Sequence, residues 1–173
     1  MRYIKKMTTS ILWFSFLFFC LVILLSSYLS GCSKKQLTPL NETDFIERME
    51  NQSFTITDTA EQFLPGQVQC SYLCEGEDFS FEFYILPSLE QTRQAFENNK
   101  GRFEEWEDDS VDLNLKSALS KDKEGANWQY YSRLTSDGFC FVCRIENTMI
   151  YAVLDVSCRP AFSELMKSLG YYL

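Results

Sequence analysis

Six stretches of the chain have the residue pattern of β-strands. The clearest is Phe79–Leu86, in which Phe79, Phe81 and Phe83 alternate with polar or amphipathic residues. The other five stretches span residues 54–57, 68–74, 128–134, 139–145 and 148–156. Asp137-Gly138 separates two of them and is a strong signal for a tight hairpin turn. Short connections of this kind predict antiparallel pairing.

Apolar residues at helical spacing predict three helices. The first begins at Asn41–Asp44 and ends near residues 51–52. The second begins after Ser88, whose side chain caps the helix with Gln91 reaching back. Gly101 and the acidic residues that follow it should end this helix between residues 99 and 106. The third begins at Pro160 and ends at Gly170, a natural C-cap.

The sequence of residues 110–125 gives the weakest indication of secondary structure in the chain. Val111, Leu113 and Leu115 alternate with polar residues, which is consistent with a short edge strand. The following segment, residues 120–125, is strongly polar and is expected to be an exposed loop.

The order of these elements predicts an α+β fold. Each helix carries a single apolar stripe, so we expect an antiparallel sheet of about six strands with the helices packed on one face. Strands followed by a helix occur at residues 68–99 and again at residues 128–169. This order suggests an internal pseudo-repeat, although the two sequences hardly match.

The N-terminal segment has the features of a secretory signal. Arg2, Lys5 and Lys6 precede an apolar run over residues 11–29. The run ends in Leu29-Ser30-Gly31-Cys32, which resembles the lipobox of bacterial lipoproteins. The resemblance implies cleavage between Gly31 and Cys32 and a diacylglyceryl group on the Cys32 thiol.

An uncleaved transmembrane helix is the alternative, because the run is close to the ~20 residues that span a bilayer. The lipobox interpretation divides the chain into a signal peptide over residues 1–31, a tether over residues 32–42 and one domain over residues 43–173. It places the protein on the outer, extracytoplasmic face of the cell membrane, held there through Cys32.

The charge of the mature chain disfavours nucleic acid as a partner. The whole chain carries a formal charge of −8, and residues 1–31 contain three basic and no acidic residues, so the remaining 142 residues carry −11. Histidine is absent from the whole sequence. The commonest general base and the commonest metal ligand are therefore missing.

Five cysteines follow the lipidation site: Cys70, Cys74, Cys140, Cys143 and Cys158. Cys140 and Cys143 should point to opposite faces of their strand, which argues against zinc. A redox pair formed by Cys140 and Cys143 is also disfavoured, because such pairs usually lie at a helix N-terminus and these two cysteines lie in the middle of a predicted strand. Cys70 and Cys74 are about 13 Å apart along one strand and cannot bond to each other. Disulfides between strands remain open, and buried free thiols are the alternative.

The acidic run Glu104–Asp109, with Asp112, lacks the alternating ligands and the glycine of a calcium loop. It is expected to be the solvated end of a helix. The sequence has no glycine-rich phosphate loop and no serine in a nucleophile elbow. We therefore expect no catalytic residues, no metal and no cofactor, and the protein is predicted not to be an enzyme.

The mature part is similar in pattern to small lipoproteins of unknown function from Gram-positive bacteria. The similarity lies in the helix and strand order from Phe45 to Tyr84 and in the segment from Gly138 onward. It implies no activity, because it brings no catalytic residues with it.

Two functions fit these observations. The first is a non-enzymatic, extracytoplasmic binding module, and the alternative is a structural or accessory subunit of a membrane-associated complex with a protein partner in the cell envelope. Strand alternation predicts a face of the sheet left open by the helices, with a composition common in interface hot spots. Its residues are Glu82, Tyr84, Tyr131, Arg133 and Arg144. An ordinary solvated face with cross-strand pairs is the competing interpretation.

Overall fold

The computed structural model describes residues 35–106, 119–135 and 138–171. The predicted lipobox, Leu29–Cys32, and the alternating segment Val111–Leu115 lie outside these residues. One compact unit spans Gln36–Leu173, and the sections below concern this domain. No helix in the described part of the chain combines the length and the apolar character needed to cross a membrane.

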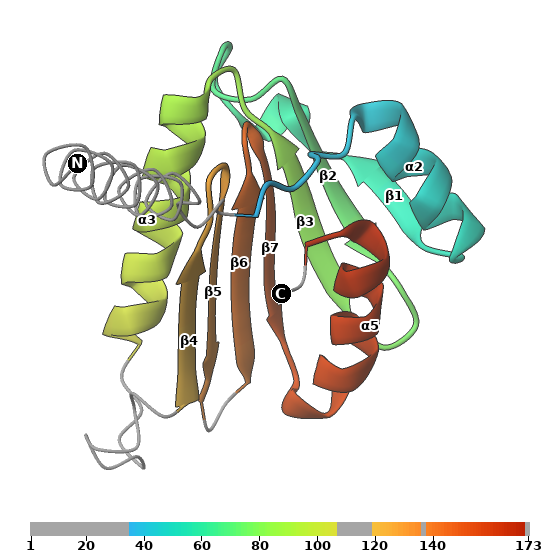
Figure 1. Ribbon diagram of the computed structural model, residues 1–173. Coiled ribbons are helices and arrows are strands. Elements are labelled where there is room, and N and C mark those ends of the chain that lie inside the picture. Colours follow the sequence, from blue (N-terminus) through green and yellow to red (C-terminus); the bar gives the residue numbers. More distant parts are fainter. Residues whose placement is uncertain (1–34, 107–118, 136–137, 172–173) are drawn as a thin grey trace, which may run out of the picture. The chain divides into compact units, whose positions relative to one another are not determined.

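Seven strands form a single sheet in which every neighbouring pair is antiparallel (Figure 1). In spatial order they are β1 (Thr55–Asp58), β2 (Cys70–Glu75), β3 (Ser80–Ile85), β7 (Thr148–Leu154), β6 (Phe139–Ile145), β5 (Trp128–Leu134) and β4 (Ser120–Glu124). Two meanders, β1–β3 and β4–β7, meet where β3 pairs with β7. The predicted α+β class is confirmed.

The described residues form three α-helices, and two of them begin at a side-chain cap close to the start that the sequence predicts. In α2 (Glu42–Asn51) the Asn41 side chain accepts from the backbone N–H of Asp44, and in α3 (Leu89–Glu105) the Ser88 side chain accepts from Gln91. The last helix, α5 (Arg159–Leu169), ends at Gly170 with a left-handed φ of 84°. The described residues also contain two short 3-10 turns, η1 (Ala60–Gln62) and η2 (Val156–Cys158).

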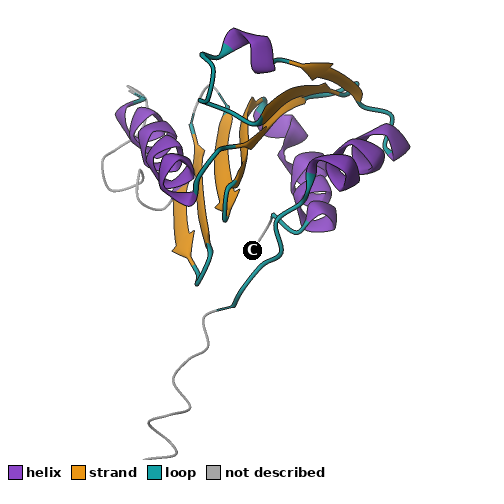
Figure 2. Ribbon diagram, turned by 90° about the horizontal axis from the view of Figure 1, so that it is seen from above, coloured by secondary structure: helices purple, strands orange, loops and turns teal. Residues whose placement is uncertain are grey.

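The helices cover both faces of the sheet, which corrects the expectation of helices on one face. Phe45 of α2 and Phe162 of α5 pack into a large core with Phe81, Phe83 and other residues of one sheet face. Phe96 and Phe103 of α3 pack into a second core with Val142 and Met149 of the opposite face. Figure 2 shows α3 on one side of the sheet and α2 and α5 on the other. We call these the α2/α5 face and the α3 face.

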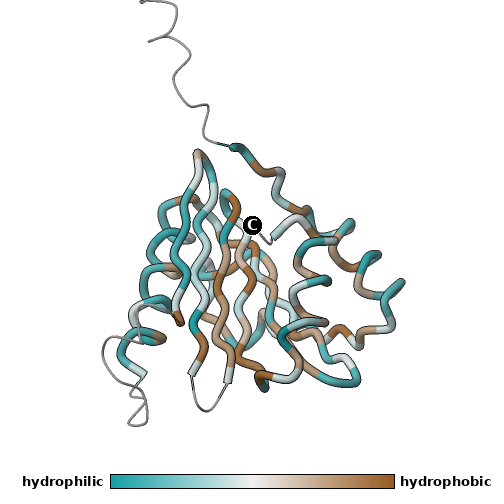
Figure 3. Tube along the Cα trace, turned by 60° about the horizontal axis from the view of Figure 1, so that its bottom comes forward, coloured by the Kyte–Doolittle hydropathy of each residue, from teal (hydrophilic) through white to brown (hydrophobic). Residues whose placement is uncertain are grey.

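Strand β6 explains why the domain has three layers. All seven of its residues are buried, including Cys140 and Val142 on the α3 face. A strand that is apolar on both faces requires cover on both faces. In Figure 3 the central strands are mainly hydrophobic, whereas α3 is mainly hydrophilic apart from the stripe that it buries.

Strand β4 corrects the expectation of a loop over residues 120–125 and brings the sheet to seven strands. Its sequence, Ser-Lys-Asp-Lys-Glu, has no apolar alternation because it is an edge strand whose side chains are mostly exposed. Asp122 of β4 pairs with Lys100 of α3. Backbone pairing with β5 and this charge contact, rather than burial, hold it in place.

The suggested pseudo-repeat does not extend to the packing. A two-fold axis relating the two meanders would run perpendicular to the sheet at the antiparallel β3–β7 pair. Such an axis keeps both following helices on one face, but α3 and α5 lie on opposite faces. The compact domain also begins earlier than residue 43, because Leu40 is buried in the core and Leu37 packs against it.

Candidate functional site

The five residues of the predicted binding face do share one face of the sheet. Strand register places Glu82 beside Tyr151, then Val142, then Tyr131, and it places Tyr84 in the same row as Arg144. This is the α3 face. Helix α3 covers part of it, so Tyr131, Arg133 and Arg144 are only 4%, 5% and 4% exposed. The expectation that these three residues lie on an open face is therefore wrong, whereas Glu82 and Tyr84 remain partly exposed.

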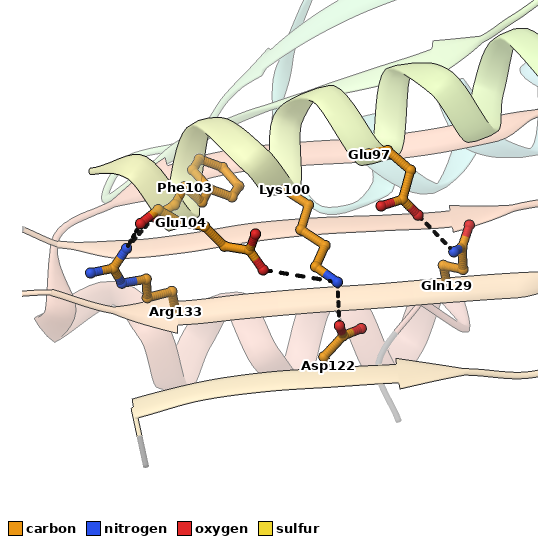
Figure 4. A network of polar contacts seen from close by, with 7 residues as sticks. All are labelled: Glu97, Lys100, Phe103, Glu104, Asp122, Gln129 and Arg133. Carbon is orange, nitrogen blue, oxygen red and sulfur yellow. Dashed lines mark hydrogen bonds and ion pairs between the residues drawn. The ribbon is translucent and has the colours of Figure 1, made fainter. Parts of the chain in front are cut away.

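The buried arginines make contacts within the domain. Arg133 donates from Nη1 to the backbone oxygens of Phe103 and Glu104, at the end of α3 (Figure 4). Arg144 donates from Nε to Oε1 of Gln129 at 2.5 Å, and Gln129 in turn donates to Glu97 of α3 at 3.0 Å. Arg133 therefore fastens α3 to the sheet directly, whereas Arg144 is linked to α3 only through Gln129.

A groove lies on the α3 face of the sheet, beside α3 and over strands β3 and β7. We call it the α3 groove. Its volume is about 610 Å³, within the range of ligand sites. Strands β3 and β7 form its floor, α3 forms one wall, and the segment between η1 and β2 forms the other. The lining residues are Phe63, Gln67, Val68, Glu82, Tyr84, Leu86, Gln91, Gln94, Ala95, Asn98, Asn99, Arg102, Met149 and Tyr151.

The α3 wall is a polar stripe beside the apolar stripe of the same helix. Residues three or four apart share one side of a helix, which aligns Gln91, Gln94, Asn98 and Arg102 along the groove. Within the described residues, the side chains of Gln94, Asn98 and Arg102 have no hydrogen-bond or ion-pair partner. They therefore offer donors and acceptors to whatever enters the groove.

Tyr151 presents one ring face to the groove. Phe103 stacks on Tyr151 with ring centroids 5.3 Å apart and also stacks on Tyr131 at 6.5 Å. Tyr131 and Tyr151 lie two strands apart in one row, with Val142 between them, so Phe103 lies between the two rings. The outer face of the Tyr151 ring is consequently turned away from Phe103, toward β3.

Glu82 and Tyr84 form the floor on the β3 side. The Tyr84 hydroxyl donates to Oε2 of Glu82, and the Tyr84 ring meets Phe63 edge to face at 5.9 Å. Burial, followed by the bond to Glu82, raises the pKa of Tyr84 far above its ordinary value. Burial also raises the pKa of Tyr151, with Arg102 opposing and Glu82 adding to the shift. Both phenols are therefore neutral at physiological pH, while the groove contains one carboxylate and one guanidinium.

The cysteines are packing residues in the described structure. Cys140 lies in the core under α3 and Cys143 in the core under α2 and α5, which confirms that they point to opposite faces. All five thiols within the described ranges are free. Burial raises the pKa of Cys70 and Cys140 to about 11, which makes their thiolates scarce at neutral pH.

The described residues contain no group of three or more His, Cys, Asp or Glu side chains placed to hold a metal ion. In the acidic run, Glu104 and Glu105 are the last residues of α3, as expected. The rest of the run, Glu107 to Asp109, and Asp112 lie outside the described residues.

The comparisons with known proteins return no relative. No protein-family model matches the chain, and neither a curated protein nor a solved structure is similar to it above the level of chance.

Sequence reasoning found the floor residues Glu82 and Tyr84 but missed the wall of the α3 groove. The signal was present as Gln91, Gln94, Asn98 and Arg102 at helical spacing, next to the buried residues Thr92, Phe96 and Phe103. That spacing shows that the polar residues border the buried stripe. The spacing alone does not reveal a groove, because the opposite wall is formed by Phe63, Gln67 and Val68, which lie earlier in the chain.

Proposed function

We propose that this protein is a lipid-anchored, extracytoplasmic binding module and that its ligand occupies the α3 groove. The supporting observation is a groove of about 610 Å³ that is lined by the ring of Tyr151 and whose α3 wall carries polar side chains without a partner among the described residues. Ligand sites combine an apolar surface with a few convergent polar groups, and this groove has both.

The proposed lipid anchor determines where in the cell the groove meets its ligand. The lipobox resemblance at Leu29–Cys32 puts the ligand outside the cytoplasm, near the membrane surface. Stable attachment requires more than one acyl chain, which a diacylglyceryl group on Cys32 supplies. A mature domain of formal charge −11 should be repelled by anionic headgroups, so the lipid rather than the protein surface would hold it at the membrane.

Binding is favoured over proton transfer because of the protonation states in the groove. The two tyrosines have pKa values raised above their ordinary range, so they act as hydrogen-bond donors and not as bases at neutral pH. The side-chain amides of the α3 wall do not titrate. These groups recognise a ligand without changing it.

The proposal is tested with the full chain in detergent micelles and a panel of amino acids, short peptides, neutral sugars and polyamines. Binding is measured by calorimetry and by the shift in melting temperature. Asn98→Trp fills the groove from an exposed helix position, and Glu90→Trp places the same side chain on α3 outside the groove. We expect any solute that binds the wild-type chain to lose at least tenfold in affinity with Asn98→Trp and to keep its affinity with Glu90→Trp.

Two outcomes would contradict the proposal. The first is that no solute of the panel binds, and the second is that both tryptophan variants bind as well as the wild type. Copurification of one membrane complex with the wild-type chain and equally with Asn98→Trp would instead favour the alternative, an accessory subunit that does not use the groove.

A further inference from the structure

Two opposite charges line the α3 groove without neutralising each other. Glu82 projects from β3 in the floor, and Arg102 belongs to the α3 wall. The two side chains form no ion pair, although both lie close enough to Tyr151 to shift its pKa in opposite directions. Tyr151 therefore lies between a carboxylate and a guanidinium that face the same space.

Each charge retains free bonding capacity. Tyr84 uses Oε2 of Glu82, and no described residue donates to Oε1. Arg102 has five N–H donors, none of which contacts an acceptor in the described structure. By contrast, the neighbouring cation on the same helix, Lys100, pairs with Asp122 and Glu104. Among the described residues Arg102 therefore differs from Lys100, because its charge is left available to a molecule in the groove.

The surface between the two charges is apolar and aromatic. The ring of Tyr151 lines the groove together with Met149, Leu86 and Val68, and Phe63 packs edge to face on Tyr84. An apolar surface lowers the local dielectric and strengthens charge interactions with a bound molecule. The exposed amides of Gln94 and Asn98 lie above it and match groups that both donate and accept, such as a peptide bond.

We propose that the α3 groove binds an amino acid or a short peptide with free termini, with the ammonium at Glu82, the carboxylate at Arg102 and the apolar part on Tyr151. This inference rests on the proposed function and specifies its ligand. A neutral sugar would use the amides and the ring but would leave both charges without partners. A polyamine would satisfy Glu82 but would be repelled by Arg102.

The test is calorimetry of the full chain in detergent micelles with the dipeptide alanyl-phenylalanine. The same dipeptide with an acetylated N-terminus, and with an amidated C-terminus, removes one charge at a time. We expect each blocked form to bind at least tenfold more weakly, which corresponds to about 1.4 kcal/mol. Free phenylalanine should bind as well, because it keeps both charges.

Charge-neutral variants connect each terminus to its residue. Glu82→Gln should weaken the unmodified dipeptide about tenfold and leave the affinity of the acetylated form unchanged. Arg102→Gln should weaken the unmodified dipeptide by the same factor and leave the affinity of the amidated form unchanged. Arg93→Gln removes an exposed cation of α3 outside the groove and should change none of these affinities.

Several results would overturn the inference. Blocked dipeptides that bind as tightly as the free one would show that the charges are not used. If a neutral disaccharide or a polyamine binds and the dipeptide does not, the proposed ligand class is wrong, whereas the proposed binding function stands. If no probe binds at all, both the inference and the proposed function fail.

Discussion

Arg133 of β5 donates two hydrogen bonds from Nη1 to the backbone oxygens of Phe103 and Glu104, in the last turn of α3 (Figure 4). The last carbonyl groups of a helix have no partner within the helix, and a cation next to them also opposes the helix dipole. The bond at Phe103 is buried. This contact stabilises the C-terminal end of α3, although the acidic residues Glu104 and Glu105 alone would destabilise it.

We therefore predict that Arg133→Met lowers the free energy of unfolding by about 1.5–3 kcal/mol, the range for hydrogen bonds to a charged group. Urea denaturation followed by circular dichroism measures the change. Arg93→Met, at an exposed position of α3, should change the free energy by less than about 0.5 kcal/mol. Equal effects of the two substitutions would show that Arg133 is not the fastening contact.

Gly125 lies directly against the indole ring of Trp128, in the turn between β4 and β5. A Cβ at Gly125 would lie 2.0 Å from Nε1 of Trp128, and this indole is buried. Gly125→Ala should therefore displace the ring and destabilise the domain by about 1–3 kcal/mol. The melting temperature and the tryptophan fluorescence spectrum should both change.

Gly101 offers the matched control for that substitution. It lies inside α3, and a Cβ there would meet no atom within 4 Å. Gly101→Ala should stabilise the domain by about 0.5–1 kcal/mol, because alanine is the better helix former. A loss of stability in both variants would contradict the explanation by local space.

The strands and helices that bury apolar side chains were predictable from the sequence. The alternation at Phe81 and Phe83 and the caps at Asn41 and Ser88 correctly indicate β3, α2 and α3. Strand β4 was not predictable in this way, because its side chains are mostly exposed and only its backbone pairing defines it. A pattern of burial cannot reveal an element that buries little.

The layer arrangement shows a different limit. Arg133, Arg144 and Tyr131 are polar or amphipathic, and alternation alone assigns such residues to solvent. Their burial depends on α3, which supplies carbonyl oxygens to Arg133 and the side chain of Glu97 to Gln129, the partner of Arg144. The largely apolar sequence of β6, in which Arg144 is the only charged residue, was the available signal that both faces of the sheet are covered.

Buried thiols make the stability of the domain sensitive to alkaline pH. Burial raises the pKa of Cys140 from 9.0 to about 11, so the folded state keeps its proton where the unfolded state loses it. The stabilisation is complete below pH 9 and is lost as the pH rises from about 9 to about 11. We predict that the free energy of unfolding falls over this window and that the fall is smaller in Cys140→Ala.

Cys158→Ala serves as the control for this pH dependence, because Cys158 is partly exposed. Other groups titrate in the same window, so the measured quantity is the difference in slope between each variant and the wild type. The prediction is wrong if Cys140→Ala keeps the full slope, or if Cys158→Ala reduces it as much.

The proposed anchor predicts a dependence on one thiol. Cys32→Ala should abolish the incorporation of radiolabelled fatty acid and should move the chain out of the membrane fraction, since two acyl chains account for stable attachment. Cys20→Ala, in the predicted signal, should leave both properties unchanged. Persistence of label and membrane association in Cys32→Ala would contradict lipidation at Cys32, whereas membrane association without any label in the wild type would favour the uncleaved transmembrane helix.

Arg144 provides the opposite case to Arg133. Its Nη1 is buried and has no hydrogen-bond partner among the described residues. Burial, with the nearby Arg93 adding to the effect, lowers the pKa of Arg144, which means that folding disfavours its charge. A buried charge that is incompletely paired costs more than an apolar side chain of similar volume, so replacing it is often neutral or stabilising.

We predict that Arg144→Met leaves the free energy of unfolding within about 1 kcal/mol of the wild type or raises it, whereas Arg133→Met lowers it. The substitution also removes the donor to Gln129, so Arg144→Met combined with Gln129→Leu separates the two effects. Both variants are compared by urea denaturation at neutral pH. A loss with Arg144→Met as large as that with Arg133→Met would show that the charge of Arg144 stabilises the fold, and that its single bond to Gln129 offsets the cost of burial.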